Sequence, residues 1–147
     1  MDKKSKNKGL IIIFLLLALL YRFVPFRAIQ VVGNSMYPTY NSGEFVIINK
    51  SKNKISNIRT NDIIVLFLEE KKYIKRVVAI EGDTVSSFNG QLQVNNMVYS
   101  DCSFSSKDII VLGKEEFFVV GDNTSVSIDS REYGIIKRSD IIGVVKN

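Results

Sequence analysis

A chain of 147 residues, 46% of them hydrophobic, is long enough for one domain-sized core and a short appendage. The formal net charge is +5, but four lysines and one aspartate within residues 1–9 carry +3 of it and leave +2 for the remainder. We therefore expect no nucleic-acid ligand, because nucleic-acid binders concentrate positive charge on one face. The chain has no histidine and one cysteine, Cys102, which excludes His-ligated metal sites and intrachain disulfides.

The N-terminal segment joins a basic tail over residues 1–9 to the apolar run LIIIFLLLALL over residues 10–20. This run is too short to cross about 30 Å of hydrocarbon as a helix, so the predicted span extends over residues 10–26. Within it, Arg22 can reach the lipid headgroups, and Tyr21 and Phe23 suit the membrane interface. The pattern predicts a transmembrane signal-anchor whose lysine-rich tail stays in the cytoplasm.

A cleaved secretory signal has the same charge and apolar profile and is the alternative for this segment. Cleavage requires small residues at the −1 and −3 positions after the apolar run. Residues 21–32, YRFVPFRAIQVV, contain one small residue, Ala28, so an uncleaved anchor is favoured. Residues 27–147 then form a catalytic or binding domain outside the cytoplasm.

The body is typical of short β-strands, because β-branched and aromatic residues gather in runs that turn signals separate. No helical period of useful length follows the anchor, and the alternating lysines of residues 50–54 suggest one face of a strand or loop. We predict a mostly β fold of antiparallel strands, barrel-like or in two packed sheets, after one N-terminal transmembrane helix. The more polar residues 86–114 suggest a satellite sheet or flap. The predicted strands cover residues 28–32, 44–48, 62–68, 73–80, 84–88, 91–94, 97–100, 109–113, 116–120 and 141–145.

The first candidate for chemistry is Ser35, in the turn-like stretch GNSMYPTY over residues 33–40. A serine hydroxyl is a weak nucleophile unless a neighbouring base removes its proton. Without histidine, the base must be a carboxylate or a lysine, and a lysine serves only when burial lowers its pKa. Cys102 has no such partner either, and we expect it to be a bystander.

Lys75 is the candidate base, because it lies inside the predicted strand YIKRVVAI. Alternation puts Tyr73, Lys75 and Val77 on one face of that strand and turns Arg76 to the other. An aromatic and an aliphatic neighbour could desolvate the Lys75 amine. Alternation alone equally allows a surface lysine on a half-exposed strand.

A third stretch, VVGDNTSVSIDSREYG over residues 119–134, leaves a strand and turns at residues 121–123. It brings Ser127, Asp129, Ser130 and Arg131 close together in sequence. One interpretation is an exposed polar loop whose Asp-Arg pair adds little stability. The other is a loop that packs under a site and orients it.

Together these stretches resemble the bacterial type I signal peptidases (leader peptidases), membrane-anchored serine proteases with a Ser-Lys dyad. The resemblance covers nearly the whole chain in order: an N-terminal anchor, then GNSMYPTY, NDIIVL, YIKRVVAIEGD and GDNTSVSIDSREYG. Each segment is similar to one conserved box of the family. The ordered set is more specific than any single box, and the lysine separates this chain from the endoplasmic-reticulum relatives, which use histidine there.

The resemblance implies that Ser35 is the nucleophile, that Lys75 is the general base and that the Ser35 N–H donates to the oxyanion. It implies that Ser127 hydrogen-bonds and orients Lys75. The resemblance further implies supporting roles: Met36 and Pro38 in shaping the turn, and Asp129 and Arg131 in supporting the last loop electrostatically. Arg76 is a further candidate for that electrostatic support.

Four positions depart from patterns common in the family. Some members carry a Ser or Thr two residues before the nucleophile as a second oxyanion donor. This chain has Gly33 at that position, as many Gram-positive enzymes have a glycine there. Thr124 replaces a common Arg, Tyr40 a common Leu and Glu81 a common Pro. None belongs to the dyad, but the second oxyanion donor is left unassigned.

The function implied is hydrolysis of preproteins after a signal peptide with small residues at −1 and −3, through an acyl-enzyme and without metal or cofactor. The partners expected are signal-peptide-bearing preproteins and a lipid membrane. We expect a monomer in the cell membrane, with a single span and the catalytic domain on the extracytoplasmic side.

Two other functions are compatible with parts of the pattern. A self-cleaving cytosolic repressor shares the Ser-Lys logic, but carries a DNA-binding domain where this chain has its apolar run. A catalytically silent anchored β-domain that binds secreted or surface proteins would retain the fold without an acylable serine.

Overall fold

The body is built on one antiparallel sheet of seven strands. The computed structural model describes residues 9–17 and 24–146. Neighbouring strands pair antiparallel throughout this sheet, as predicted. Its spatial order is β1 (Phe26–Gln30), β2 (Phe45–Asn49), β11 (Ile141–Val145), β3 (Ile63–Leu68), β4 (Lys71–Ala79), β9 (Glu116–Val120) and β10 (Ile136–Lys137).

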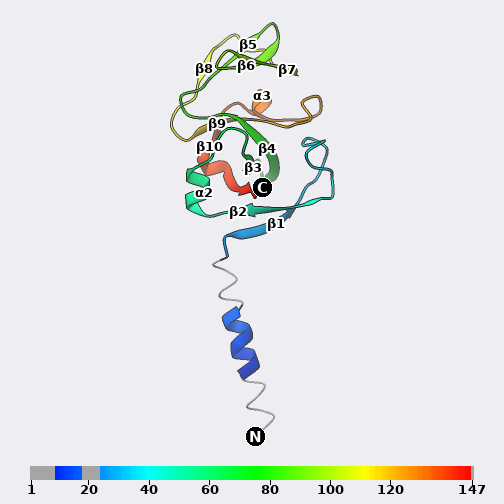
Figure 1. Cartoon of the computed structure of the whole chain (residues 1–147), viewed down its shortest axis with the longest axis vertical. Coiled ribbons are helices and arrows are strands. Elements are labelled where there is room, and N and C mark those ends of the chain that lie inside the picture. The colour runs from blue at the N-terminus through cyan, green and yellow to red at the C-terminus, as the bar shows by residue number, and fades with distance from the viewer. Residues whose placement is uncertain (1–8, 18–23, 147) are drawn as a thin grey trace.

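A second sheet of four strands corresponds to the satellite sheet expected for residues 86–114. Figure 1 shows it at the end of the body opposite β1. Its hairpin turn at Asn89 and Gly90 has positive φ at both residues, 51° and 78°, as a tight two-residue connection requires. The order of strands is β7 (Met97–Ser103), β6 (Gln91–Val94), β5 (Thr84–Phe88) and β8 (Ile110–Val111).

Buried apolar side chains form three clusters, one of which joins the two sheets. Successive residues of β3 point to opposite sides, so that Ile64 packs in one cluster and Val65 in another. Both faces of this central strand are therefore covered. The third cluster joins the sheets, since Phe118 of β9 packs edge-on against Phe104, 5.7 Å away between ring centroids. Cys102 lies buried in this third cluster.

Two short helices were not predicted. The helix α2 (Lys52–Ser56) replaces the strand or loop expected from the alternating lysines, because Ser51 caps it by accepting a hydrogen bond from the Lys54 N–H. The helix α3 (Ser130–Tyr133) is capped by Asp129. A single-turn 3-10 helix, η1 (Arg138–Asp140), leads into β11. None of these segments is long enough to show a helical period in sequence.

The N-terminal region is helical over residues 9–17, and its apolar side chains are exposed. Neither this helix nor any other in the described residues has the length and apolar character needed to cross a bilayer. The central part of the predicted 10–26 span, residues 18–23, and the tail at 1–8 lie outside the described residues. At the far end of that span, Phe26 instead begins β1 and pairs with Asn49.

Candidate active site

Ser35 lies in a turn that is anchored on both sides. Met36 next to it is fully buried in the core below, and the Tyr40 N–H donates to the Met36 carbonyl at 2.9 Å. The Ser35 carbonyl accepts a hydrogen bond of 3.0 Å from the Asn123 N–H. Pro38 is exposed in the same turn. The buried Met36 and the hydrogen bond from Asn123 thus fix the position of Ser35 in the turn.

Lys75, in β4, contacts Ser35 in the turn between β1 and β2. Its Nζ donates to the Ser35 Oγ at 2.8 Å, although 40 positions separate the residues in sequence. Only 3% of Lys75 is exposed, so the buried alternative for this strand is the correct one. The Tyr73 ring lies on the same side, with its centroid 5.9 Å from the Lys75 Nζ.

Burial changes the acid-base behaviour of this amine. Loss of solvation lowers the pKa of Lys75 from 10.5 to about 8, against the attraction of the Asp129 carboxylate. An appreciable fraction of the side chain is then neutral near physiological pH. A neutral amine 2.8 Å from a hydroxyl can accept its proton, which is what activation of a serine requires.

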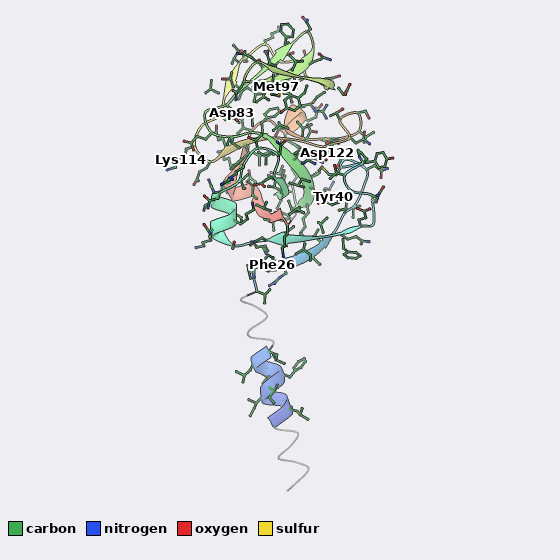
Figure 2. The ribbon with its side chains drawn as sticks, in the orientation of Figure 1. Phe26, Tyr40, Asp83, Met97, Lys114 and Asp122 are labelled. Atoms are coloured by element: carbon green, nitrogen blue, oxygen red, sulfur yellow. The ribbon has the colours of Figure 1, made fainter. Side chains whose placement is uncertain are left out.

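Arg76 points away from Lys75, as alternation predicts. Its partner is Asp122 in the last loop: Nε and Nη2 of Arg76 donate to the two Asp122 oxygens at 2.7 and 2.6 Å, so Arg76 supports that loop together with the Asp129–Arg131 pair. The hydroxyl of Thr39, one residue before Tyr40, also donates to Asp122. Figure 2 shows Tyr40 and Asp122 on the same side of the body.

These contacts tie the serine turn to the last loop. Burial alone would raise the pKa of Asp122, but the hydrogen bonds from Arg76 and Thr39 outweigh it and hold that pKa below its usual value. Sequence reasoning treated Asp122 as part of a turn signal and missed this pairing. The sequence signal that could have indicated the pairing is the acidic side chain of Asp122 directly after Gly121.

Asp129 organises the last loop from a buried position, with 1% of it exposed. One oxygen accepts from the Gly121 N–H at 3.0 Å, and Nε of Arg131 donates to the other at 2.8 Å. Burial alone would raise the pKa of Asp129, but the hydrogen bonds from Arg131 and Gly121 keep it below its usual value. The Asp129 carboxylate is therefore charged, and both of its oxygens accept hydrogen bonds.

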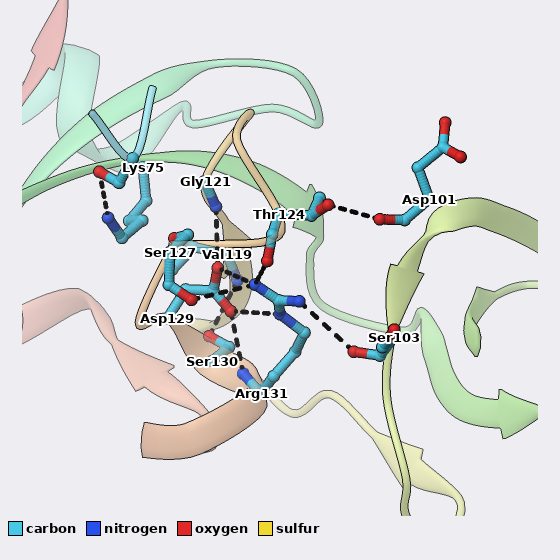
Figure 3. Close-up of polar contacts among 11 residues, drawn as sticks. Lys75, Asp101, Ser103, Val119, Gly121, Thr124, Ser127, Asp129, Ser130 and Arg131 are labelled. Carbon is cyan, nitrogen blue, oxygen red and sulfur yellow. Dashed lines mark hydrogen bonds and ion pairs between the residues drawn. The ribbon is translucent and has the colours of Figure 1, made fainter. Parts of the chain in front are cut away.

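Arg131 extends this network over the loop and onto the satellite sheet. Its Nη2 donates to the carbonyls of Thr124 and Ser127 at 2.8 and 3.1 Å, and its Nη1 to the Ser103 carbonyl at 3.4 Å. Figure 3 shows the guanidinium between the loop and β7. The loop is thus supported as the second interpretation of this stretch predicted.

Ser127 lies in the site but does not make the predicted contact. Its Oγ is buried and has no hydrogen-bond partner among the described residues, so the predicted hydrogen bond with Lys75 is absent. The reason lies in the backbone, where Ser127 is held by Asn123 at its N–H and by Arg131 at its carbonyl. Its side chain packs against Gly121, where a Cβ would stand 2.2 Å from the Oγ.

Two connected clefts meet at the Ser35–Lys75 pair. The first, about 300 Å³, runs between the segment after β1 and the start of β4, with Val31, Val65 and Tyr73 among its walls. The second, about 420 Å³, continues past Ser35 toward Val126 and Ile128. Both are mainly apolar, with the hydroxyl and the amine as the polar groups at their junction.

Metal-dependent chemistry and a cysteine nucleophile have little support in the described residues. They contain no group of three or more acidic, cysteine or histidine side chains placed to hold a metal ion. Cys102 is buried, and burial raises the pKa of its thiol, which opposes formation of a reactive thiolate. The arrangement is suited to nucleophilic attack by Ser35 with Lys75 as base.

Comparisons with known proteins agree on one family. The family model described as "Signal peptidase, peptidase S26" matches residues 6–147. The chain is 36% identical to signal peptidase I of Bacillus amyloliquefaciens, over 92% of this chain and 80% of that protein. It is 34% identical to signal peptidase I T of Bacillus subtilis, over 98% and 86%. A crystal structure of a signal peptidase I from Enterococcus faecalis aligns over 61% of this chain and 97% of that one, with 20% identity and a TM-score of 0.49.

Because Lys75 is buried, we expect its replacement by an apolar residue to stabilise the folded protein. The fall of the Lys75 pKa from 10.5 to about 8 corresponds to roughly 3 kcal/mol against folding. Because the unfolded chain binds this proton more tightly, the penalty is complete below pH 8 and disappears as the pH rises toward 10.5. We expect Lys75→Met to raise the free energy of unfolding at neutral pH by up to this amount, measured by urea unfolding in detergent.

The exposed Lys71 provides the control, since Lys71→Met removes no buried charge and should change the free energy of unfolding little. A Lys75→Met variant that is no more stable than the parent at neutral pH would contradict the desolvation account.

A side chain at Gly121 would clash at the contact between the serine turn and the last loop. A Cβ there would stand 2.5 Å from the Ser35 carbonyl oxygen and 2.2 Å from the Ser127 Oγ. We expect Gly121→Ala to displace the serine turn and slow acylation of Ser35 by a serine-directed inhibitor about 100-fold, a loss that a displacement of about 1 Å is able to cause. Mass spectrometry of the intact protein measures the acylation.

Gly113→Ala is the matched control, because its Cβ would meet only the flexible end of Glu116, at 3.1 Å. Equal acylation rates for Gly121→Ala and Gly113→Ala would show that the close approach at Gly121 does not matter.

Proposed function

The chain belongs to the signal peptidase family, peptidase S26, and from this membership we propose that it cleaves signal peptides from exported preproteins with a Ser35–Lys75 dyad. The observation that carries the proposal is the 2.8 Å separation between Lys75 Nζ and Ser35 Oγ at a buried amine of lowered pKa. The family supplies the reaction class. The geometry of these two side chains supports the assignment of the nucleophile and the base.

In the proposed mechanism, neutral Lys75 takes the hydroxyl proton as the Ser35 Oγ attacks the scissile carbonyl. The resulting ammonium returns that proton to the leaving amine, which frees the mature protein and leaves the signal peptide as an ester on Ser35. Lys75 then takes a proton from a water that attacks the ester, and returns it to Ser35 as the signal peptide leaves. One lysine thus serves as base and acid in both halves.

The negative charge on the attacked carbonyl oxygen needs donors at the turn. The Ser35 N–H is one candidate, because no group among the described residues accepts a hydrogen bond from it. Gly33 has no side chain to offer, and its N–H donates to the Ser42 Oγ at 3.1 Å. We therefore assign one backbone donor, of the kind that contributes roughly 3–4 kcal/mol to the transition state.

The substrate is proposed to bind as an added strand beside β4. Residues 71–75 pair with β3 along one edge only, since β9 pairs with β4 from Arg76 onward. Residues 72–75 of this segment line the first cleft together with Val31 and Val32. An extended peptide can use the main-chain groups of this segment for backbone hydrogen bonds.

Specificity for small residues at −1 and −3 is part of the proposal. Alternate side chains of an extended peptide point the same way, so the residues at −1 and −3 would both face the cleft floor. That floor includes the buried side chains of Val65 and Ile74. A shallow apolar floor next to the dyad accepts small side chains and excludes large ones.

The remaining proposals concern where the enzyme works. The exposed apolar side chains of the 9–17 helix support a membrane anchor, with the lysine-rich tail in the cytoplasm and the catalytic domain outside. Such an anchor would hold the cleft where preproteins emerge. We propose a monomer, because the dyad and both walls of the cleft come from one chain.

The dyad predicts loss of cleavage when either member is truncated. We expect Ser35→Ala and Lys75→Ala each to abolish processing, because the first removes the nucleophile and the second its base. The full chain in detergent is mixed with a preprotein, and the new N-terminus of the product is sequenced. Small residues at −1 and −3 of the cut are expected.

Lys114→Ala, at an exposed position in the turn before β9, should cleave at the parental rate. Undiminished cleavage by Ser35→Ala or Lys75→Ala would remove the dyad, and failure of the parent chain to cleave or be acylated would favour a silent anchored β-domain.

The lowered pKa of Lys75 predicts the pH profile. Only the neutral amine accepts the Ser35 proton, so kcat/KM should rise about tenfold per pH unit below pH 8 and level off above it. Single-turnover cleavage across this range measures the profile, with circular dichroism at each pH as the check on folding. A profile without an inflection in the region of pH 8 would contradict a lysine base.

A further inference from the structure

We propose that Tyr133 is a positioning residue for substrate specificity, which holds the Tyr73 ring against the cleft beside Lys75 and thereby limits the side chain accepted next to the scissile bond. The inference rests on the proposed signal-peptide cleavage and assigns a residue that does not itself touch the cleft. The juxtaposition behind it is a contact between two tyrosines from β4 and α3, 60 positions apart in sequence.

Tyr73 forms part of the cleft wall beside Lys75. It lines both clefts that meet at the Ser35–Lys75 pair. Its ring centroid is 5.9 Å from the Lys75 Nζ, so the substrate side chain closest to the scissile bond must pass beside this ring. The conformation of Tyr73 therefore sets the room available at that position.

Tyr73 is only partly buried, and its conformation is restrained from behind. The Tyr133 hydroxyl donates to the Tyr73 hydroxyl at 3.1 Å, and the two ring centroids are 5.7 Å apart at a tilt of 58°. The hydrogen bond raises the pKa of Tyr133 to about 12, which keeps this donor protonated over the working pH range. Among the described residues that line the clefts, Tyr133 does not appear, so it acts through Tyr73.

Tyr133 is itself held by the network below the site. It ends α3, and its N–H donates to the Asp129 carbonyl at 2.9 Å. Figure 1 shows α3 next to β9, between the seven-stranded sheet and the satellite sheet. The Asp129–Arg131 pair that orders the last loop thus also fixes the support of the cleft wall.

Removing this support should widen the cleft and relax specificity. Without the Tyr133 ring, Tyr73 can rotate away from Lys75 and admit larger side chains at −1. Tyr133→Phe keeps the ring contact and removes only the hydroxyl. It should therefore have a smaller effect than Tyr133→Ala on the same substrates.

The experiment compares two preproteins that differ only at −1, one with Ala and one with Val, cleaved by the full chain in detergent. We expect Tyr133→Ala to raise the ratio of kcat/KM for Val over Ala about tenfold, within the range that small changes in an apolar pocket produce. Tyr133→Phe and Tyr73→Phe should each raise it by less. Their double variant should match either single one, because both remove the same hydrogen bond.

Glu132→Ala is the matched control, since this exposed residue shares α3 and is not among the described residues that line either cleft. It should leave the ratio unchanged. An unchanged ratio in Tyr133→Ala, or an equal fall for both preproteins, would overturn the proposal and leave Tyr133 with a structural role. If Tyr133→Ala does not fold, an unchanged ratio in Tyr133→Phe decides against it. Failure of the parent chain to cleave the Ala preprotein would instead refute the proposed function.

Discussion

The site depends on one buried amine that has no carboxylate of its own. Two carboxylates, Asp129 and Asp122, are close enough to raise the pKa of Lys75, yet each is held by its own guanidinium, from Arg131 and Arg76. The polar contact left for Lys75 is the Ser35 hydroxyl. Because neither carboxylate forms an ion pair with the amine, desolvation prevails and its pKa falls. The two arginines therefore matter to the proposed chemistry although neither hydrogen-bonds to Ser35.

The same two ion pairs also position the loops. Asp122 joins the last loop to the serine turn through Thr39 and to β4 through Arg76. Asp129 holds the start of that loop at Gly121 and the start of α3. Because Gly121 has no Cβ, the serine turn and the last loop can approach closely. Charge neutralisation and close packing thus support the same arrangement.

Much of the fold followed from local patterns. The ten predicted strand segments overlap strands of the structure, because alternation of β-branched residues and turn signals such as Asn89-Gly90 are local properties. The helices α2 and α3 were missed, since helices of one turn have no measurable period and form through capping by Ser51 and Asp129. Resemblance to a family indicated Ser35, Lys75, Asp129 and Arg131, but the hydrogen bond it suggested between Ser127 and Lys75 is absent from this structure.

The sequence by itself limited the chemistry open to a catalytic serine and identified the strand that carries the candidate base. Without histidine, the base had to be a carboxylate or a lysine, and alternation along YIKRVVAI put Lys75 on the side of Tyr73 and away from Arg76. Only the tertiary structure decided that Lys75 is buried and within 2.8 Å of Ser35, that Arg76 belongs to Asp122, and that Tyr133 supports Tyr73. The reason is physical: alternation sets the direction of a side chain, whereas burial and contact depend on what distant parts of the chain pack against it.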